Sequence, residues 1–251
     1  SEQGWLSVLG DRAGDALFDV GLIDWAGCGV VHIVGGAGAL VGARMLSYRN
    51  QYVTDVGAED AKGVWKPRYS RNVRGQYVIN NLPPASPVLA CLGVFILWFG
   101  WYGFNAGSTL SGTDLTIAHV ATTTTLGAST GAIGAMVTSW LWFGKPDPSV
   151  ALNGALAGLV GITAGTWVVS PVGAVIIGIV AGILVVLSVE FLDKVLHIDD
   201  PVGAVSVHGT AGAWGTIAVG LFADGVNAPG IVGLFYGGGA AQLGIQVLGV
   251  L

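Results

Sequence analysis

Long stretches without charged residues, separated by short charged or proline-containing segments, dominate the sequence. A membrane helix needs about 20 predominantly apolar residues. The charge-free stretches predict helical spans over residues 24–46, 85–108, 117–143, 149–168, 171–192 and 201–223, and a last span over 239–251 that is cut short. The long apolar stretch before position 190 is divided at Ser170-Pro171, because proline disfavours helix at the residue before it.

The composition supports a chain that lies mostly within a membrane. Hydrophobic residues make up 53% of the sequence and charged residues only 10%, and the mean hydropathy is +0.71. Soluble domains carry about 25% charged residues. Many of the 42 glycines are spaced like Gly154 and Gly158, and small residues at such spacing let membrane helices approach closely. We therefore predict an all-α, polytopic membrane helical bundle that forms one domain over residues 1–251.

The positive charges predict how the spans are oriented. If the segment after the first span, residues 44–84, is cytoplasmic, nine of the ten Lys and Arg residues lie inside and only Arg12 lies outside. This distribution follows the positive-inside rule. The prediction places residues 1–23 outside the cell and the protein in the lipid bilayer of the plasma membrane. The net charge of −5 gives no indication of nucleic-acid binding.

The sequence contains no pattern for a metal site, a cofactor or a disulfide framework. Its two cysteines, Cys28 and Cys91, lie in apolar stretches without a Cys/His cluster at metal-ligand spacing, and we interpret them as packing residues. The chain begins without Met and ends within an apolar run, so we expect that it is cut at both ends.

Two of the four histidines lie deep within predicted spans. His32 follows Asp24 by eight residues, as His208 follows Asp200, and in both cases a Val precedes the His and a Gly/Ala-rich run follows it. Each His would lie about 12 Å into its helix, near the middle of the membrane. The two spans are five apart in order and run in opposite directions, which is typical of an inverted repeat with a binding site at the midplane. We therefore predict that the two imidazoles meet, and ionisable residues at this depth indicate function.

The two aspartates and the other two histidines have structural interpretations. Asp24 and Asp200 each open a helix, where an N-cap aspartate stabilises by about 1 kcal/mol. Asp24 is also a candidate for ordering backbone groups near a cation entry site. His119 lies near the outer end of its span and is interpreted as structural, and His197 lies at a span boundary and is interpreted as a surface residue.

An aromatic segment at the outer end of the second span, residues 98–108, is a candidate entry site. Its aromatic residues are interleaved with glycine, and it ends in Asn105 and Ser108. Aromatic rings at a span end also form the interfacial belt of membrane proteins. Their faces attract small cations, however, and a hydroxyl accepts a hydrogen bond from an N–H donor. The combination favours a vestibule for a monovalent cation.

Four segments, in this order, resemble the ammonium transporter (Amt/Mep/Rh) family and its Amt-type members in particular. They are DWAGCGVVHIVGGAGALVGA at 24–43, WFGWYGFNAGS at 98–108, NGALAGLVGIT at 153–163 and DDPVGAVSVHGTAGAWG at 199–215. The resemblance implies a fold of eleven spans with an inverted repeat, of which this chain covers about spans 5 to 11, and a homotrimer with one pore per subunit. It also implies ammonium or ammonia as the substrate, methylammonium as a surrogate, no cofactor and no enzymatic activity.

The resemblance also implies roles for individual residues. These are His32 and His208 as twin pore histidines, Trp101 and Ser108 as outer residues that hold ammonium, Phe104 as one of two stacked gate phenylalanines, and Thr163 as a residue near the pore. Asp24 resembles a structurally important aspartate, whereas Gly203 departs from the pattern because many members carry an acidic residue there. The expected mechanism is deprotonation of ammonium near the gate and passage of neutral ammonia, because an intact cation in hydrocarbon costs several kcal/mol.

Three other functions are compatible with parts of the sequence. An ammonium sensor would keep the same pore residues and signal through a partner, and a cytoplasmic regulatory protein is a candidate partner in either case. An intramembrane hydrolase would pair a serine such as Ser108 or Ser129 with a histidine. A water or glycerol channel would carry paired Asn-Pro-Ala segments, which the sequence lacks.

Overall fold

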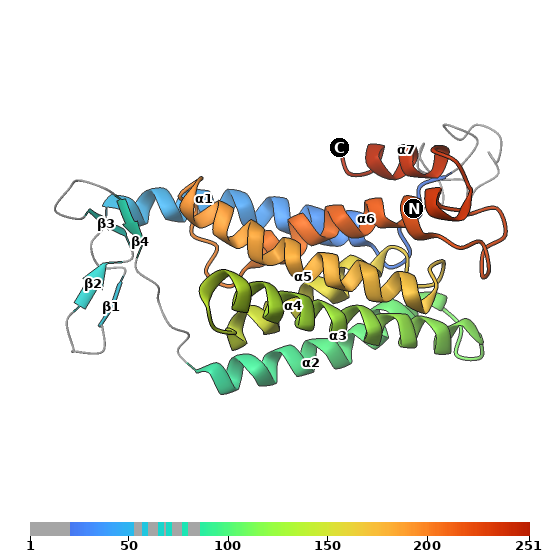
Figure 1. The fold of residues 1–251 in the computed structure, drawn as a ribbon, viewed down its shortest axis with the longest axis horizontal. Helices are drawn as coiled ribbons and strands as arrows, with labels where there is room; N and C mark the ends of the chain where they lie inside the picture. Colours follow the sequence, from blue (N-terminus) through green and yellow to red (C-terminus); the bar gives the residue numbers. More distant parts are fainter. Residues whose placement is uncertain (1–20, 53–56, 60–64, 68, 72–76, 80–85) are drawn as a thin grey trace.

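The computed structural model describes residues 21–52, 57–59, 65–67, 69–71, 77–79 and 86–251, and most of these residues form a bundle of helices (Figure 1). The predicted all-α bundle is confirmed in this part of the chain. Its α-helices are α1 (Val34–Tyr52), α2 (Pro87–Asn105), α3 (Thr116–Phe143), α4 (Pro148–Thr163), α5 (Pro171–Lys194), α6 (Ala211–Phe222) and α7 (Ala241–Leu248). Shorter helices adjoin them, the π-helices η2 (Cys28–Ile33) and η4 (Val205–Thr210) and the 3-10 helices η3 (Ala106–Thr109) and η5 (Leu234–Tyr236).

Three of the helices begin at a proline that follows a capping residue. The side chains of Ser86, Asp147 and Ser170 accept hydrogen bonds from first-turn backbone N–H groups of α2, α4 and α5. Proline is suited to the next position, because the missing N–H has no intrahelical partner there and its fixed φ is helical. The boundary predicted at Ser170-Pro171 therefore coincides with the start of α5.

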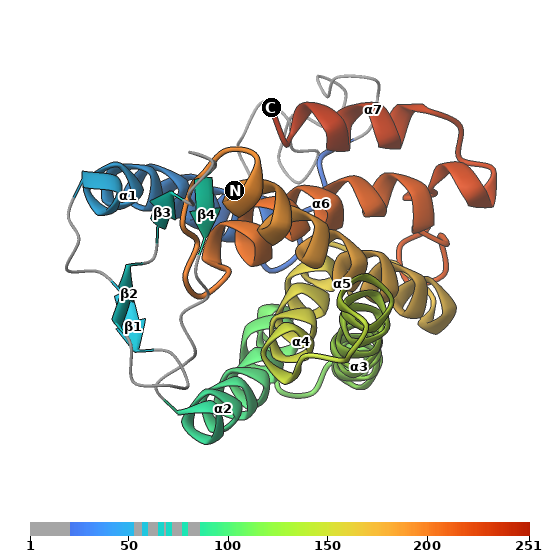
Figure 2. The same cartoon turned by 60° about the vertical axis from the view of Figure 1, so that its left-hand side comes forward.

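The centre of the bundle is formed by α3, α4 and α5, which pack along one another (Figure 2). Glycines at these contacts bring the helix backbones close together. A Cβ atom added at Gly154 would overlap the side chain of Ala135 and the backbone of Gly131, and one added at Gly158 would overlap the carbonyl of Gly127. The small-residue patterns in the sequence thus correspond to close helix contacts.

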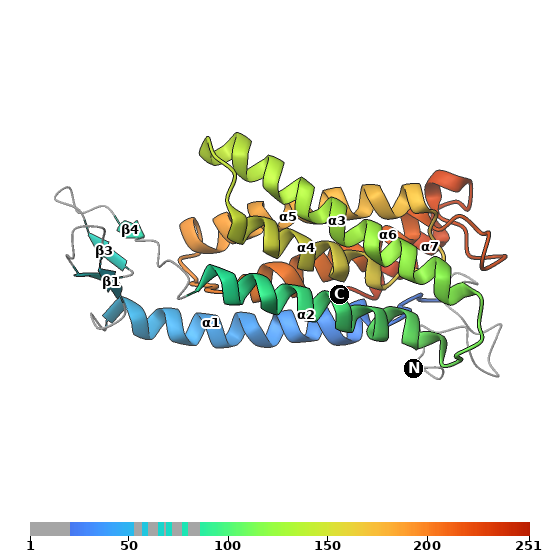
Figure 3. The same ribbon diagram turned by 90° about the horizontal axis from the view of Figure 1, so that it is seen from below.

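The helices α1 and α2 lie at the edge of the bundle, along one side in Figure 3. Their outer side chains stay exposed although they are apolar, with exposed fractions of 65% for Val34, 70% for Met45, 77% for Val88 and 80% for Phe99. Three helical segments in the described residues are long and apolar enough to cross a membrane, Cys28–Leu46, Pro87–Thr109 and Pro171–Lys194. The remaining predicted spans stay predictions, although each contains a helix.

The segment between α1 and α2 contains four short strands that the sequence analysis did not predict. β1 (Gly57–Glu59) pairs with β2 (Trp65–Pro67), and β3 (Tyr69–Arg71) pairs with β4 (Tyr77–Ile79), both antiparallel. The pairs lie at the end of the molecule farthest from α7 (Figure 1). Three-residue strands are too short to produce the alternation over 4–8 residues by which strands are predicted.

Candidate functional site

The two histidines that the repeat predicts to meet are in direct contact. Nδ1 of His208 lies 3.1 Å from Nδ1 of His32, and the rings stack with centroids 5.1 Å apart at 22°. His32 is on η2 and His208 is on η4, and the helices that continue from them, α1 and α6, run in opposite directions (Figure 1). Both histidines therefore lie on π-helical turns, which occur frequently at functional sites.

A shared Nδ1 hydrogen bond fixes what the two rings present elsewhere. One Nδ1 must carry the proton and donate, and the other must accept. The donor ring then has an unprotonated Nε2, and the acceptor ring has a protonated Nε2. Nε2 of His32 is buried and has no hydrogen-bond partner among the described residues. The pair thus offers one hydrogen-bond donor and one acceptor at its Nε2 atoms.

The aspartates that precede the two π-helices make matching hydrogen bonds. Oδ2 of Asp24 accepts from the backbone N–H groups five and six residues later, those of Gly29 and Val30. The carboxylate of Asp200 likewise accepts from N–H groups five and six residues later, at the start of η4. The N-cap prediction needs correction, because the cap positions are Gly27 and Ala204. The aspartates lie before a non-helical turn and reach the first helical N–H groups across it.

Two glycines allow the histidine elements to touch. Gly36 follows His32 by four residues, and a Cβ atom there would overlap the backbone nitrogen and Cα of Gly209. Gly212 follows His208 by four residues, and a Cβ atom there would lie 3.4 Å from Cβ of His32. The equivalent glycine of each element therefore packs against the opposite element.

Aromatic rings surround His32. Trp101 stacks on it with centroids 5.2 Å apart at 13°, and Phe104 meets it edge-on at 5.5 Å. Trp101 is only 7% exposed, and its indole Nε1 donates to Oγ1 of Thr163 at 3.0 Å. The structure therefore places Trp101 beside the histidine pair, together with Phe104 and Thr163. His32 covers one face of its ring, and the role of holding ammonium at the outer surface stays a prediction.

Ser108 lies one turn beyond Phe104, on η3. It is half-buried, and its hydroxyl donates to the carbonyl of Phe104 at 2.7 Å. Asn105, three residues earlier, is fully buried; its side-chain Nδ2 donates to Oγ1 of Thr124, and its backbone carbonyl oxygen accepts from Nε1 of Trp25. These contacts fix the end of α2 from two sides. The hydroxyl oxygen of Ser108 remains able to accept a hydrogen bond.

The remaining polar residues singled out in the sequence have local partners. Nε2 of His119 lies 3.0 Å from the carbonyl oxygen of Val169, which fits its structural interpretation. Ser129 donates its hydroxyl to the carbonyl of Thr125. Neither Ser129 nor Ser108 has a histidine as a hydrogen-bond partner among the described residues, so the structure gives no arrangement for nucleophilic catalysis there. In the same residues, no three His, Cys, Asp or Glu side chains gather as they would around a metal ion.

Several contacts at the site were missed by the sequence analysis. The rings of Trp25 and Trp167 lie 5.0 Å apart, and the thiol of Cys28 donates to the carbonyls of Val160 and Gly212. On α7, Gln246 is buried and contacts the chain just before Asp24. The two glutamines of α7, polar residues in an otherwise apolar run, are the one signal that was available in the sequence.

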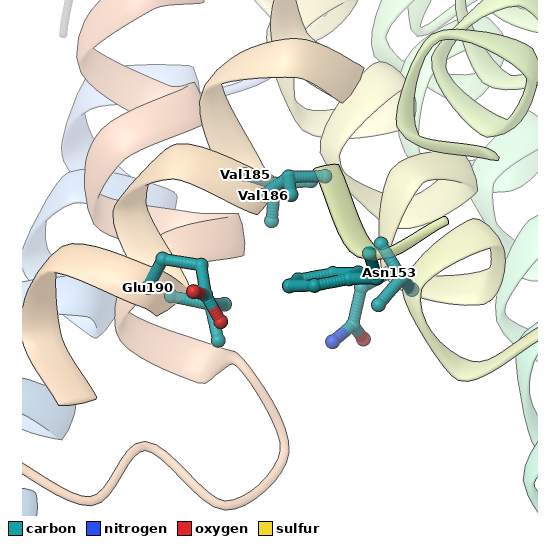
Figure 4. Close-up of a pocket in the computed structure, with 7 residues that line it drawn as sticks. Asn153, Val185, Val186 and Glu190 are labelled. Carbon is teal, nitrogen blue, oxygen red and sulfur yellow. The ribbon is translucent and has the colours of Figure 1, made fainter. Parts of the chain in front are cut away.

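A separate small cavity lies where α3 ends, between α4 and α5 (Figure 4). Its volume is about 60 Å³, and Asn153, Val185, Val186 and Glu190 are among its lining residues. Glu190 pairs with Lys194, whose ammonium lies 5.9 Å from the ring centroid of Phe143. None of the predicted site residues lines this cavity.

Comparison with known proteins identifies relatives over most of the chain. A family model described as the Ammonium Transporter Family matches residues 1–64 and 61–251. The chain is 43% identical over 223 residues to ammonium transporter Amt2 of Archaeoglobus fulgidus, and this match covers 86% of this chain and 43% of that protein. It is 38% identical over 270 residues to ammonium transporter 1 member 1 of Arabidopsis thaliana, and this match covers 100% of this chain and 50% of that protein. The chain therefore spans about half the length of these curated relatives.

Solved structures show the same fold. A sensor Amt protein has a TM-score of 0.75 and 36% identity, over 93% of this chain and 52% of that chain. Mep2 of Candida albicans has a TM-score of 0.72 and 31% identity, over 94% of this chain and 48% of that chain.

Proposed function

The chain belongs to the ammonium transporter family, and we propose that it forms part of a pathway that receives ammonium at the outer face of a membrane and conducts it as ammonia past His32 and His208. Members of this family are integral membrane proteins, in agreement with the long apolar helices of the bundle. The observation that carries the proposal is the Nδ1–Nδ1 contact of the two histidines beside a wall of aromatic rings.

The histidine pair suits a small molecule that both donates and accepts hydrogen bonds. Ammonia has three N–H groups and one lone pair. The pair presents one protonated and one unprotonated Nε2, because a single proton is shared between the Nδ1 atoms. Ammonia can therefore accept from one ring and donate to the other. This complementarity supports the proposal that the histidines supply, in an apolar pore, the hydrogen bonds that water would otherwise make to ammonia.

The same geometry disfavours charge at the pair. If both rings were cationic, two Nδ1–H groups would face each other 3.1 Å apart. Like charges at that distance repel strongly in a medium of low dielectric constant. A cation in hydrocarbon also costs several kcal/mol. We therefore favour deprotonation of ammonium before it reaches His32, with the proton passing to water at the outer face and neutral ammonia as the species that passes.

The roles of the outer residues follow from their positions. Ser108 stays the proposed recruitment residue, because its hydroxyl oxygen can accept from ammonium at the end of α2. Phe104, whose edge meets His32, stays the proposed gate. For Trp101 we propose a different role from the one the resemblance implied, as a wall that Thr163 holds against His32. Asp24, Asp200 and Asn105 are proposed to support the site through the backbone and side-chain contacts described above.

The wider setting of the pathway is also a proposal. We propose that the protein lies in the plasma membrane. The distribution of positive charges places residues 1–23 outside the cell and the segment 44–84 in the cytoplasm. The expected assembly is a homotrimer with one pore per subunit. A cytoplasmic regulatory protein is the expected partner. The transporters of Archaeoglobus fulgidus and Arabidopsis thaliana named above are about twice as long as this chain. We therefore propose that the pore wall also includes segments other than residues 1–251.

Uptake of methylammonium tests the proposal. Cells without ammonium transporters of their own would express the full-length protein, and labelled methylammonium would be followed over time. We expect saturable uptake that ammonium inhibits competitively. Absence of uptake by folded protein at the cell surface would reject conduction.

An ammonium sensor is the second candidate, because one of the similar structures is a sensor Amt protein. A sensor would bind ammonium at the same residues without net flux. Binding measured by calorimetry, together with no uptake in the experiment above, would favour the sensor. Labelling by a fluorophosphonate probe would instead indicate a hydrolase, for which Ser108 and Ser129 offer no histidine partner among the described residues.

A further inference from the structure

Helix α7 carries two amide side chains that are almost completely buried. Gln242 is 2% exposed and Gln246 is 0% exposed. They are four residues apart and therefore lie on one face of the helix. A buried amide is destabilising unless its polar atoms are hydrogen-bonded. The partners of these two side chains therefore indicate what this face of α7 does.

Gln246 uses every polar group of its amide. Its Oε1 accepts from the backbone nitrogen of Ile23 at 2.7 Å and from Nε2 of Gln242 at 3.3 Å. Its Nε2 donates to the carbonyl oxygens of Ile23 and Thr216, both at 2.8 Å. The amide thus binds the N–H and the C=O of Ile23 together, as a neighbouring β-strand would.

Gln242 extends the same contact by two residues. Its Nε2 donates to the carbonyl of Gly21 at 3.0 Å. Leu22, between the two contacts, packs against Gly249 of the same C-terminal segment, where an added Cβ would overlap its side chain. The extended segment 21–23 is therefore held on α7 by side-chain hydrogen bonds and by packing.

The position of this segment determines the position of η2. Ile23 directly precedes Asp24, whose carboxylate binds the first N–H groups of η2, the helix that carries His32. On the other side, Thr216 lies on α6, which continues from the element of His208. A single side chain, Gln246, therefore bonds to the chain before His32 and to the helix after His208.

We propose that Gln246 is a positioning residue for the histidine pair, which it aligns by joining the segment before Asp24 to α6, with Gln242 as a secondary support. This inference rests on the proposed function, because alignment matters only if the pair serves the pathway. The consequence is that a substitution in α7 alters transport through His32 without touching the substrate.

Gln246→Met tests the inference, because methionine has a similar shape and no amide. We expect uptake of methylammonium per molecule at the cell surface to fall about tenfold, since the segment before His32 loses its hydrogen bonds to Gln246 and the histidine pair loses its alignment. We also expect the pH profile of uptake to change toward that of His32→Ala. In the double variant Gln246→Met/His32→Ala, uptake should be no lower than in His32→Ala alone, because both changes remove the same pairing.

Two further variants keep the test decisive. Gln246→Glu, buried as the neutral acid, retains an acceptor for the nitrogen of Ile23 and one O–H donor in place of two N–H donors, so its uptake should lie between those of the wild type and Gln246→Met. Val247→Ala changes a side chain on the same helix that is 38% exposed, and it should behave like the wild type. If Gln246→Met does not reach the surface, the Glu variant decides. If the Gln246 variant that reaches the surface takes up methylammonium at the wild-type rate and with an unchanged pH profile, the inference is overturned.

A measurement independent of transport separates this inference from the proposed function. Nitrogen-15 NMR of protein labelled at histidine reports whether the two Nδ1 atoms share a hydrogen bond. The shared proton should be present in the wild type and in Val247→Ala and lost in Gln246→Met. If the wild type shows no uptake but the signal responds in this way, conduction fails and the positioning role stands. If the signal is the same in all three proteins, the positioning role fails.

Discussion

The π-helix of His32 and the π-helix of His208 begin in the same way but are held differently by their surroundings. In both, an aspartate eight residues before the histidine accepts hydrogen bonds from the N–H groups five and six residues after itself. In both, the glycine four residues after the histidine faces the opposite element. The repeated sequence thus produces a repeated local structure.

The differences lie in the contacts that each element makes with the rest of the bundle. His32 is 6% exposed and is covered by two aromatic rings, whereas His208 is half-buried. The thiol of Cys28 in η2 donates to two carbonyls, but the hydroxyl of Ser206 in η4 is buried with no hydrogen-bond partner among the described residues. The comparison teaches that the repeat sets the pairing and that the rest of the bundle fixes the His32 element more firmly.

The largest effect should come from separating the two elements. In Gly36→Ala the new Cβ would overlap the backbone of Gly209, so the helices must move apart and the Nδ1 contact is lost. Overpacking of this kind costs about 1–3 kcal/mol. We expect uptake per surface molecule to fall about tenfold or more.

Gly35→Ala is the matched control, because a Cβ there has nothing within 4 Å. Gly212→Ala should be intermediate, since its nearest neighbours are Cγ1 of Ile33 at 3.1 Å and the carbonyl of Cys28 at 3.3 Å. Equal uptake by Gly36→Ala and Gly35→Ala would show that close approach at this position is not needed.

The next effect concerns the two aspartates. Asp24→Ala and Asp200→Ala each remove two hydrogen bonds to backbone N–H groups, which should lower the free energy of unfolding by about 1–3 kcal/mol. We expect the smaller loss at Asp24, because Gln246 also holds the segment before it. Thermal unfolding of the purified protein in detergent measures both. A larger loss at Asp24 would contradict the view that η2 is the better supported element.

A smaller effect is expected at the aromatic wall of His32. Thr163→Val removes the acceptor of the Trp101 indole N–H and leaves that donor buried. The cost should be about 1 kcal/mol, corresponding to a several-fold reduction in the maximal rate of uptake. Thr163→Ser keeps the hydroxyl and should retain the wild-type rate. If Val and Ser at this position give the same rate, the orientation of Trp101 does not matter for transport.

The smallest effect should be at Ser108, on η3 beyond the end of α2. Ser108→Ala removes one hydrogen-bond acceptor, so the concentration of methylammonium at half-maximal uptake should rise about two- to fivefold, with little change in the maximal rate. Kinetics of uptake at several concentrations separate the two quantities. An unchanged half-maximal concentration would remove Ser108 from the recruitment site.

Much of the fold was predictable because it depends on local sequence. Capping residues followed by proline mark the starts of α2, α4 and α5, and each predicted span contains a helix. The meeting of His32 and His208 was also predictable, because identical spacing from Asp24 and Asp200 occurs in two spans of opposite direction. The repeat of this spacing in two spans indicates that the two histidines lie close together, which a single Asp–His motif could not indicate.

The sequence did not predict features that depend on contacts between distant residues. The π-helical turns arise where each aspartate reaches across a non-helical turn, and no residue type encodes this choice. Gln246 and Ile23 are 223 positions apart, so their hydrogen bonds were invisible without the fold. The expected role of Trp101 came from the resemblance alone, and the stacking of its ring on His32 could not be read from the sequence.

Coupling between the two histidines tests the central claim most directly. Methylammonium uptake would be measured for the full-length protein, for His32→Ala, for His208→Ala and for the double variant, each corrected for protein at the surface. If the rings act as one hydrogen-bonded pair, each single variant should reduce uptake or alter its pH profile, and the double variant should be little worse than the singles. Independent effects that multiply in the double variant, or normal uptake by both singles, would contradict the account.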